Sequence, residues 1–167
     1  MFPSSKPGHG RHRCSDWLVF SRDLAAGTSP DKECLESLRR RGFRAVVNLN
    51  AEGVAGAPLS PNVEATWAHA EALEHARLAL YDFPSSRDVD AFVELYERMP
   101  KPLYVHSVDG ASALTLARIA VFVSGGELDE RVEQLLAPRL TEEWRRFAAT
   151  EIATRSARPR VLTTRNE

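Results

Sequence analysis

The sequence predicts an α/β domain of three layers, in which helices flank a central, mostly parallel β-sheet. Two stretches carry this prediction. Residues 101–124 read as a short buried strand, a turn of small residues and a buried helix. Residues 30–49 read as a helix, a Gly-Phe pair and a buried strand, which together form one unit of a parallel sheet. With 167 residues and 43% hydrophobic content, the chain can bury one sizeable core.

Composition narrows the function classes. A formal net charge of −1 gives no electrostatic case for a nucleic-acid or membrane partner, and no run of 18 apolar residues indicates a membrane span. The two cysteines form no CxxC pair and have no histidine at finger spacing, so we expect neither a metal nor a cofactor. We expect a cytoplasmic protein, and the richness in Ala and Arg is typical of a bacterial source.

The ends of the chain differ from its middle. Residues 1–15 mix Pro and Gly with Ser, Lys, Arg and His, and predict a disordered arm. Residues 155–167 hold several arginines and predict a disordered basic tail. The folded domain is therefore expected over residues 16–154.

The first half of the domain is expected to open with a hairpin of two strands, residues 17–20 and 24–27. Ser29 is the predicted N-cap of the next helix, with Pro30 at its first position and Gly42 just after its end. A buried strand, residues 45–49, follows.

In the second half of the domain, helices and strands are expected to continue to alternate. The predicted elements are a mobile loop at 51–62, a helix at 63–77, a strand at 78–81, a helix at 87–99, the central strand and helix, and two last helices at 128–135 and 141–154.

The turn after the central strand resembles the signature loop of the cysteine-dependent protein phosphatases of the dual-specificity type. That family reads Val-His-Cys, two residues, Gly, two residues, Arg. Here Val105, His106 and Gly110 match, but Ser107 stands at the position of the cysteine and Ala113 at that of the arginine.

The resemblance extends over about residues 18–137. The stretch LAAGTSPDKECLESLRRRGFRAVVNLN looks like the opening of a compact bacterial phosphatase-like branch, whose strand ends Asn-Leu-Arg. Asn48 and Leu49 match that ending, and Asn50 replaces the arginine. The resemblance implies a cysteine-phosphatase-like fold and a phosphate-binding P-loop.

The two replacements remove what the family uses for chemistry. A serine hydroxyl without an adjacent base cannot match a thiolate, and Ala113 cannot grip phosphate as an arginine fork does. In the family the histidine before the nucleophile supports the loop, so His106 is expected to be structural. Arg118, five residues beyond Ala113, is expected to face solvent.

The other loop residues are candidates for ligand binding: Val108, Asp109, Gly110, Ala111 and Ser112. Asp109 has two open interpretations, since its carboxylate either repels a phosphate inside the loop or caps the loop from outside. Ser112 is expected to cap the helix. Asp82, which follows the predicted strand, is a better candidate than Asp88 for the family's general acid. Without a nucleophile it has nothing to protonate, so a turn-forming role is the safer interpretation of Asp82.

Three functions remain in view. The first is an inactive pseudophosphatase that binds a protein or a phosphorylated ligand in a regulatory role. The second is a protein tyrosine or dual-specificity phosphatase, a phosphoester hydrolase, carrying a Cys-to-Ser change at Ser107. The third is a hydrolase that uses another set of residues around the same pocket, such as Asp82 with His106.

Overall fold

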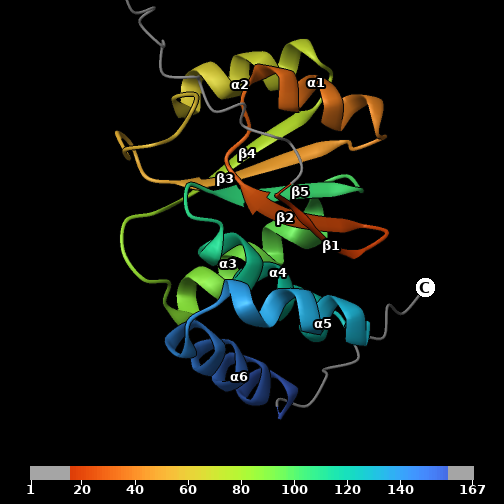
Figure 1. The fold of residues 1–167 in the computed structure, drawn as a ribbon, viewed down its shortest axis with the longest axis vertical. Coiled ribbons are helices and arrows are strands. Elements are labelled where there is room, and N and C mark those ends of the chain that lie inside the picture. The colour runs from red at the N-terminus through yellow and green to blue at the C-terminus, as the bar shows by residue number, and fades with distance from the viewer. Residues whose placement is uncertain (1–15, 158–167) are drawn as a thin grey trace, which may run out of the picture.

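The computed structural model describes residues 16–157, so the arm expected at 1–15 and the tail beyond residue 157 lie outside the described residues. A five-stranded sheet has the order β1-β2-β5-β3-β4. Helices α1 and α2 cover one face of it, and α3 to α6 cover the other (Figure 1). This is the predicted three-layer α/β fold. No helix in the described part of the chain is long and apolar enough to cross a membrane.

The strands are β1 (Leu18–Ser21), β2 (Leu24–Thr28), β3 (Ala45–Asn50), β4 (Glu74–Leu80) and β5 (Leu103–Ser107). The first two form the predicted antiparallel hairpin, whereas β2, β5, β3 and β4 run parallel. Every residue of β3 and β5 is buried, as expected for strands covered on both faces. The carboxyl end of β5 therefore lies at the middle of one edge of the sheet.

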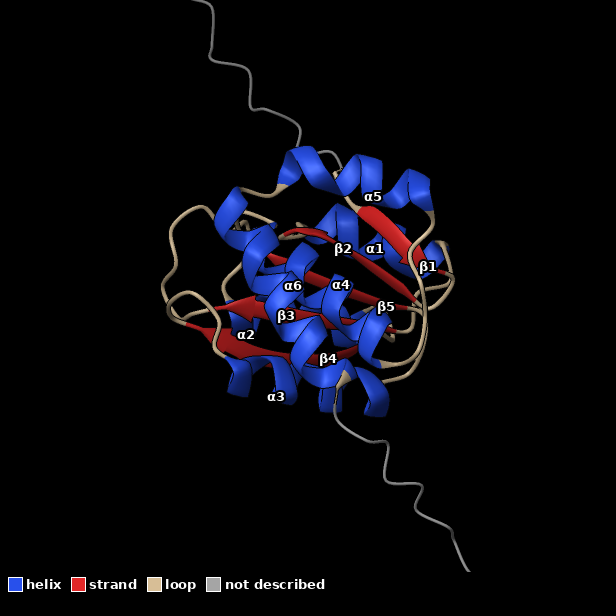
Figure 2. Cartoon of the chain, turned by 90° about the horizontal axis from the view of Figure 1, so that it is seen from below, coloured by secondary structure: helices blue, strands red, loops and turns tan. Residues whose placement is uncertain are grey.

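The helices are α1 (Lys32–Arg40), α2 (Pro61–Ala70), α3 (Ser86–Arg98), α4 (Ala111–Val123), α5 (Glu130–Leu136) and α6 (Glu142–Ser156), with a 3-10 turn at Ala137–Arg139. Helix α4 is buried along most of its length and packs on β2 and β5, and α6 covers it in turn (Figure 2). The larger hydrophobic core fills the space between these helices and the sheet.

Helix α1 begins later than the sequence predicts. Its N-cap is Asp31, whose Oδ1 accepts a hydrogen bond from the Cys34 amide at 2.8 Å. The predicted cap, Ser29, is instead buried, and its hydroxyl contacts the Asn50 and His106 side chains. The Ser29 hydroxyl therefore binds side chains of other elements instead of capping the helix as the local sequence predicts.

The helix predicted over 63–77 is too long. Helix α2 ends at Ala70, where the Leu73 amide bonds to the Ala68 carbonyl and Ala72 takes a positive φ of 55°. Residues 74–80 then pair in parallel with β3 instead of continuing the helix. Pairing with a strand of the sheet has overridden the helical propensity of an Ala- and Glu-rich stretch.

Helix α6 extends into the predicted tail. Arg155 lies in its last turn with its side chain only 6% exposed, paired with Glu151 and, at 2.7 Å, with Asp90. It also donates to the Ser86 carbonyl at 2.9 Å. These contacts hold the last turn of α6 against the start of α3.

Candidate functional site

The site is built where β5 ends and α4 begins. Ser107 is the last residue of β5, and Ala111 is the first of α4. Gly110, between them, is the N-cap of α4 with φ 77°, a left-handed conformation that glycine adopts without strain. A tight turn followed by a helix start is the geometry of an anion-binding loop, and here the Gly110 amide donates to the Ser107 carbonyl at 3.2 Å.

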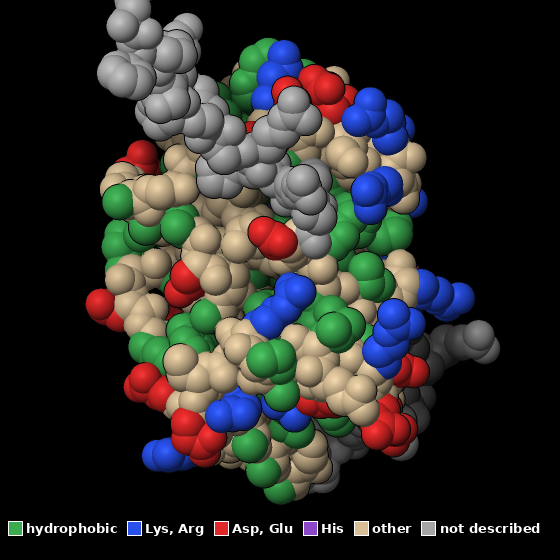
Figure 3. Space-filling model, in the orientation of Figure 1, with side chains coloured by type: hydrophobic (Ala, Val, Ile, Leu, Met, Phe, Trp, Pro, Cys, Tyr) green, Lys and Arg blue, Asp and Glu red, His purple; other side chains and the backbone are tan. Residues whose placement is uncertain are grey.

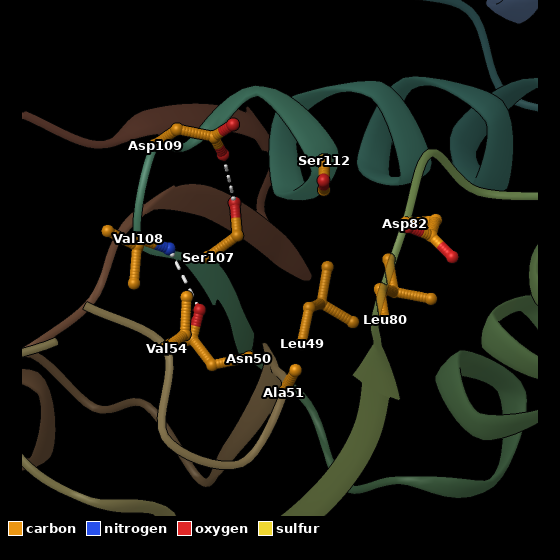
Figure 4. A pocket seen from close by; sticks show the side chains of 10 residues that line it. All are labelled: Leu49, Asn50, Ala51, Val54, Leu80, Asp82, Ser107, Val108, Asp109 and Ser112. Atoms are coloured by element: carbon orange, nitrogen blue, oxygen red, sulfur yellow. Dashed lines mark hydrogen bonds between the residues drawn. The ribbon is translucent and has the colours of Figure 1, made fainter. Parts of the chain in front are cut away.

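Asp109 turns its carboxylate into this loop. Its Oδ1 accepts the Ser107 hydroxyl at 3.1 Å and the Ala111 amide at 3.1 Å (Figure 4). The Ala113 amide approaches the Ser107 Oγ at 3.4 Å. Of the two interpretations left open, capping therefore describes the geometry, although the cap sits inside the loop and brings its negative charge with it.

A second side chain occupies the loop from the side of β3. The Asn50 Oδ1 accepts the Val108 amide at 2.9 Å, and its Nδ2 donates to the Ser29 Oγ at 2.8 Å. Sequence reasoning noted Asn50 only as a departure from the resembled pattern. Its strand-end position beside the loop was the available signal, because the carboxyl ends of neighbouring parallel strands share one edge of a sheet.

Beneath the loop lies a buried polar network centred on Glu64 of α2, which is 1% exposed. Its Oε1 contacts the Nε2 atoms of His106 and His75, at 2.9 and 3.0 Å, and its Oε2 accepts the Asn48 Nδ2 at 2.9 Å. The other ring nitrogen of His106 contacts the Ser29 Oγ at 3.1 Å. His106 thus supports the loop from below.

Burial by itself raises the pKa of Glu64, but attraction to His106 and hydrogen bonds from His106 and His75 more than offset it and lower the pKa to about 2. Sequence reasoning missed Glu64. The one available signal was its position four residues before Ala68, which places both on the buried face of α2.

A cavity of about 240 Å³ opens beside Ser107. Asp82, on the loop after β4, lies across it from Ser107 (Figure 4). The other lining residues come from β3, the loop after it, β4 and the signature loop: Leu49, Asn50, Ala51, Val54, Leu80, Val108, Asp109 and Ser112. The structure thus brings together the predicted Asp82, Ser107, Val108, Asp109 and Ser112. The capping role expected of Ser112 was wrong, because α4 begins at Ala111 with Gly110 as its N-cap, so Ser112 lies within the helix.

Other predicted residues lie elsewhere. His106 is fully buried and does not line the cavity with Asp82. Ala113 is fully buried in the hydrophobic core, and Asp88 completes a capping box with Ser85 at the start of α3. Arg118 does not face solvent as expected, because its Nη2 binds Glu133 of α5 at 3.1 Å with the side chain 22% exposed. Within residues 16–157, no three His, Cys, Asp or Glu side chains are grouped to hold a metal ion.

Solved structures share this architecture at low identity. A candidate phosphatase of the DUF442 group from Shewanella putrefaciens superposes with a TM-score of 0.71 at 18% identity, covering 83% of this chain and 92% of that one. Another from Neisseria meningitidis gives 0.65 at 14%, covering 80% and 96%. TpbA of Pseudomonas aeruginosa, as a cysteine-to-serine variant in complex with phosphotyrosine, gives 0.60 at 15%, covering 82% of each chain. At these identities the likeness establishes the fold.

A search of curated proteins gave no match. A family model described as a DSP-PTPase phosphatase fused to NAD+ kinase matches residues 17–151, which is most of the chain. The resemblance in the signature loop, the three-layer sheet and this match agree, and the chain belongs to that family of dual-specificity phosphatase domains.

Proposed function

We propose that this chain is a catalytically inactive phosphatase domain, a pseudophosphatase, that works as a binding or regulatory module. The observation that carries the proposal is the position of Asp109. Its carboxylate accepts the Ala111 amide and the Ser107 hydroxyl, which are groups that a bound phosphate would engage in an anion-binding loop. An anion built into the loop competes with a phosphoryl group and repels it.

The chemistry of the loop supports the same conclusion. Ser107 donates its hydroxyl proton to Asp109, and both ring nitrogens of the neighbouring His106 are engaged by Glu64 and Ser29. Among residues 16–157, no Lys, Arg or His side chain lines the cavity, so this part of the chain offers no cation there to stabilise transition-state charge on a phosphoryl group.

The alternative is a phosphatase altered at Ser107 alone. The phosphotyrosine complex of the TpbA cysteine-to-serine variant favours it, because such a variant of a related fold still holds its ligand. Asp109 and Ala113 favour the hypothesis of an inactive domain, because a single change at Ser107 accounts for neither residue.

Restoring the missing groups tests the proposal. We expect Ser107→Cys alone to give little hydrolysis of an aryl phosphate, because the Asp109 carboxylate beside position 107 opposes the thiolate that the loop amides and the start of α4 would otherwise stabilise. Adding Ala113→Arg should raise the rate by about 100-fold or more, the usual effect of one group that stabilises transition-state charge.

The control is Ser107→Cys with Ala113→Gln, which adds a long side chain without charge, and circular dichroism of each variant verifies folding. Equal rates in the arginine and glutamine variants would show that position 113 is not the missing clamp. Hydrolysis by the unaltered protein would refute the proposal directly.

A further inference from the structure

The cavity beside Ser107 has the opposite charge character to a phosphate site. Two carboxylates, those of Asp82 and Asp109, line it, and its other walls are apolar or uncharged. The start of α4 contributes about half a positive charge, which the nearer carboxylate outweighs. The balance is negative, whereas a site for a phosphoryl dianion must be positive.

We infer that this cavity binds a cation on an apolar stem, and that its ligand is the guanidinium group of an arginine side chain. The inference rests on the proposed inactive role and gives the binding module a ligand class. The sign of the charge in this cavity follows from two residues of this chain. Asp109 adds a carboxylate to the loop, and Ala113 stands where the resembled family has an arginine.

The walls of the cavity suit the stem of such a ligand. Leu49, Leu80 and Val54 line it together with Ala51 and Val108, and apolar walls of this kind pack against methylene groups. Its volume of about 240 Å³ corresponds to roughly eight water molecules at about 30 Å³ each, which is room for one long side chain.

Acceptors are in place for the charged end. The Asp109 Oδ1 is engaged by Ser107 and Ala111, and its second oxygen can accept from a guanidinium group, while the exposed Asp82 carboxylate adds a second negative charge across the cavity. Guanidinium fits better than ammonium, because it is planar, less strongly hydrated and donates in pairs.

Two arginines of the described chain lie near the cavity without lining it. Arg77 donates to the Asn50 carbonyl at 3.4 Å and pairs with Glu52 at 3.0 Å. Arg139 lines a second cavity that also borders Asp109, and its Nη1 donates to the Asp16 carbonyl at 3.3 Å. It is not among the residues that line the cavity beside Ser107.

The test is a titration of the ¹⁵N-labelled protein with N-acetyl-arginine methylamide, followed by the amide signals of residues 107–113. The neutral isostere N-acetyl-citrulline methylamide, free agmatine and inorganic phosphate are titrated in parallel. We expect saturable shifts with the arginine compound, and about two- to fivefold weaker binding of the citrulline compound, since one exposed charge pair contributes up to about 1 kcal/mol. Agmatine separates a free cation from a peptide side chain once the second positive charge at its free amine is allowed for. Binding of agmatine more than about fivefold tighter than that of the arginine compound exceeds what one extra exposed charge contributes, and would assign the site to a small molecule and overturn the arginine side chain as its ligand.

Variants of the two aspartates test the inference further, because Asp109→Asn should change arginine binding and phosphate binding in opposite directions. Asp82→Asn and Asp109→Asn should each weaken arginine binding about two- to fivefold, and Asp109→Asn should at the same time tighten phosphate binding. Glu94→Gln, on the exposed face of α3, removes the same charge away from the cavity and should change neither. Equal binding of the arginine and citrulline compounds, or phosphate binding tighter than arginine binding, would overturn the inference. Either result leaves the proposed lack of catalysis standing, which is overturned only by phosphoester hydrolysis.

Discussion

Glu64 is the residue on which the support of the loop depends. Its carboxylate is fully buried and holds His106, His75 and Asn48, and through His106 and Ser29 the contacts continue to Asn50 and the Val108 amide. A buried anion with several donors is stable only while all its partners remain, since an unpaired partner loses both water and its hydrogen bond. The loop conformation is therefore set by side chains outside the loop.

Replacing Glu64→Gln should lower the free energy of unfolding by about 3 kcal/mol at pH 7, the equivalent of lowering its pKa from 4.5 to about 2 on folding. A carboxyl whose folded pKa is depressed stabilises the fold above its unfolded pKa. That contribution is lost as pH falls, so the difference between wild type and variant should shrink between pH 4.5 and 2. Urea unfolding at several pH values measures it.

Glu94→Gln is the matched control for this experiment, because Glu94 is exposed on α3. A difference between wild type and Glu64→Gln that stays constant from pH 6 to pH 3 would contradict the role assigned to the buried carboxylate.

At the scale of elements, α6 is joined by charge to the start of α3 and by aromatic packing to the loop that precedes α3. Arg155 and Glu151 of α6 are both nearly buried, and Ser86 of α3 donates to the Glu151 Oε1 at 2.6 Å. Beside them, Phe83 packs on Trp144 and Phe147 of α6, with ring centroids 4.3 and 5.2 Å apart. Helix α6 thus anchors the loop that carries Asp82, next to the cavity.

Arg155→Met should lower the free energy of unfolding by about 3 kcal/mol, because it leaves Glu151 buried with an uncompensated charge. Arg145→Met removes an exposed pair with Glu142 on the same helix and should cost less than about 1 kcal/mol. Chemical unfolding compares the two variants. Equal costs would mean that the end of α6 is not part of the folded domain.

The sequence predicted the elements better than their ends. Strand and helix patterns located the hairpin, the central strand and α4, and the resemblance supplied the three-layer arrangement. The start of α1 and the end of α2 were wrong, because Ser29 is used by a network from other elements and because residues 74–80 pair with β3. Neither partner is visible in local sequence.

Site residues that lie in one loop could be predicted from the sequence, whereas those that reach the site from separate elements could not. Ser107, Asp109 and Ser112 follow one another in a recognisable loop, and Asp82 followed from its position after a strand. Asn50 and Glu64 reach the site from separate elements, and a buried glutamate looks like a surface residue in an Ala- and Glu-rich helix until its partners are known.

For the whole molecule, charge is balanced overall and uneven locally. Acidic and basic side chains are interspersed among the described residues of the face in Figure 3, in keeping with a net charge of −1. The cavity beside Ser107 departs from this balance, because among the residues that the structure describes two carboxylates line it and no cation does. The sheet and its helices are those of a phosphatase fold, and under the proposed function the acidic cavity stands where that fold would hydrolyse a phosphoester.

The proposed lack of catalysis is tested most directly by measuring hydrolysis of a generic aryl phosphate by the unaltered protein between pH 5 and 8. A Ser107→Ala variant purified in the same way is the comparison. The account predicts no turnover above the buffer blank for either protein, because thiolate and arginine are both missing and Asp109 occupies the loop. Turnover that persists through purification and disappears in Ser107→Ala would contradict it.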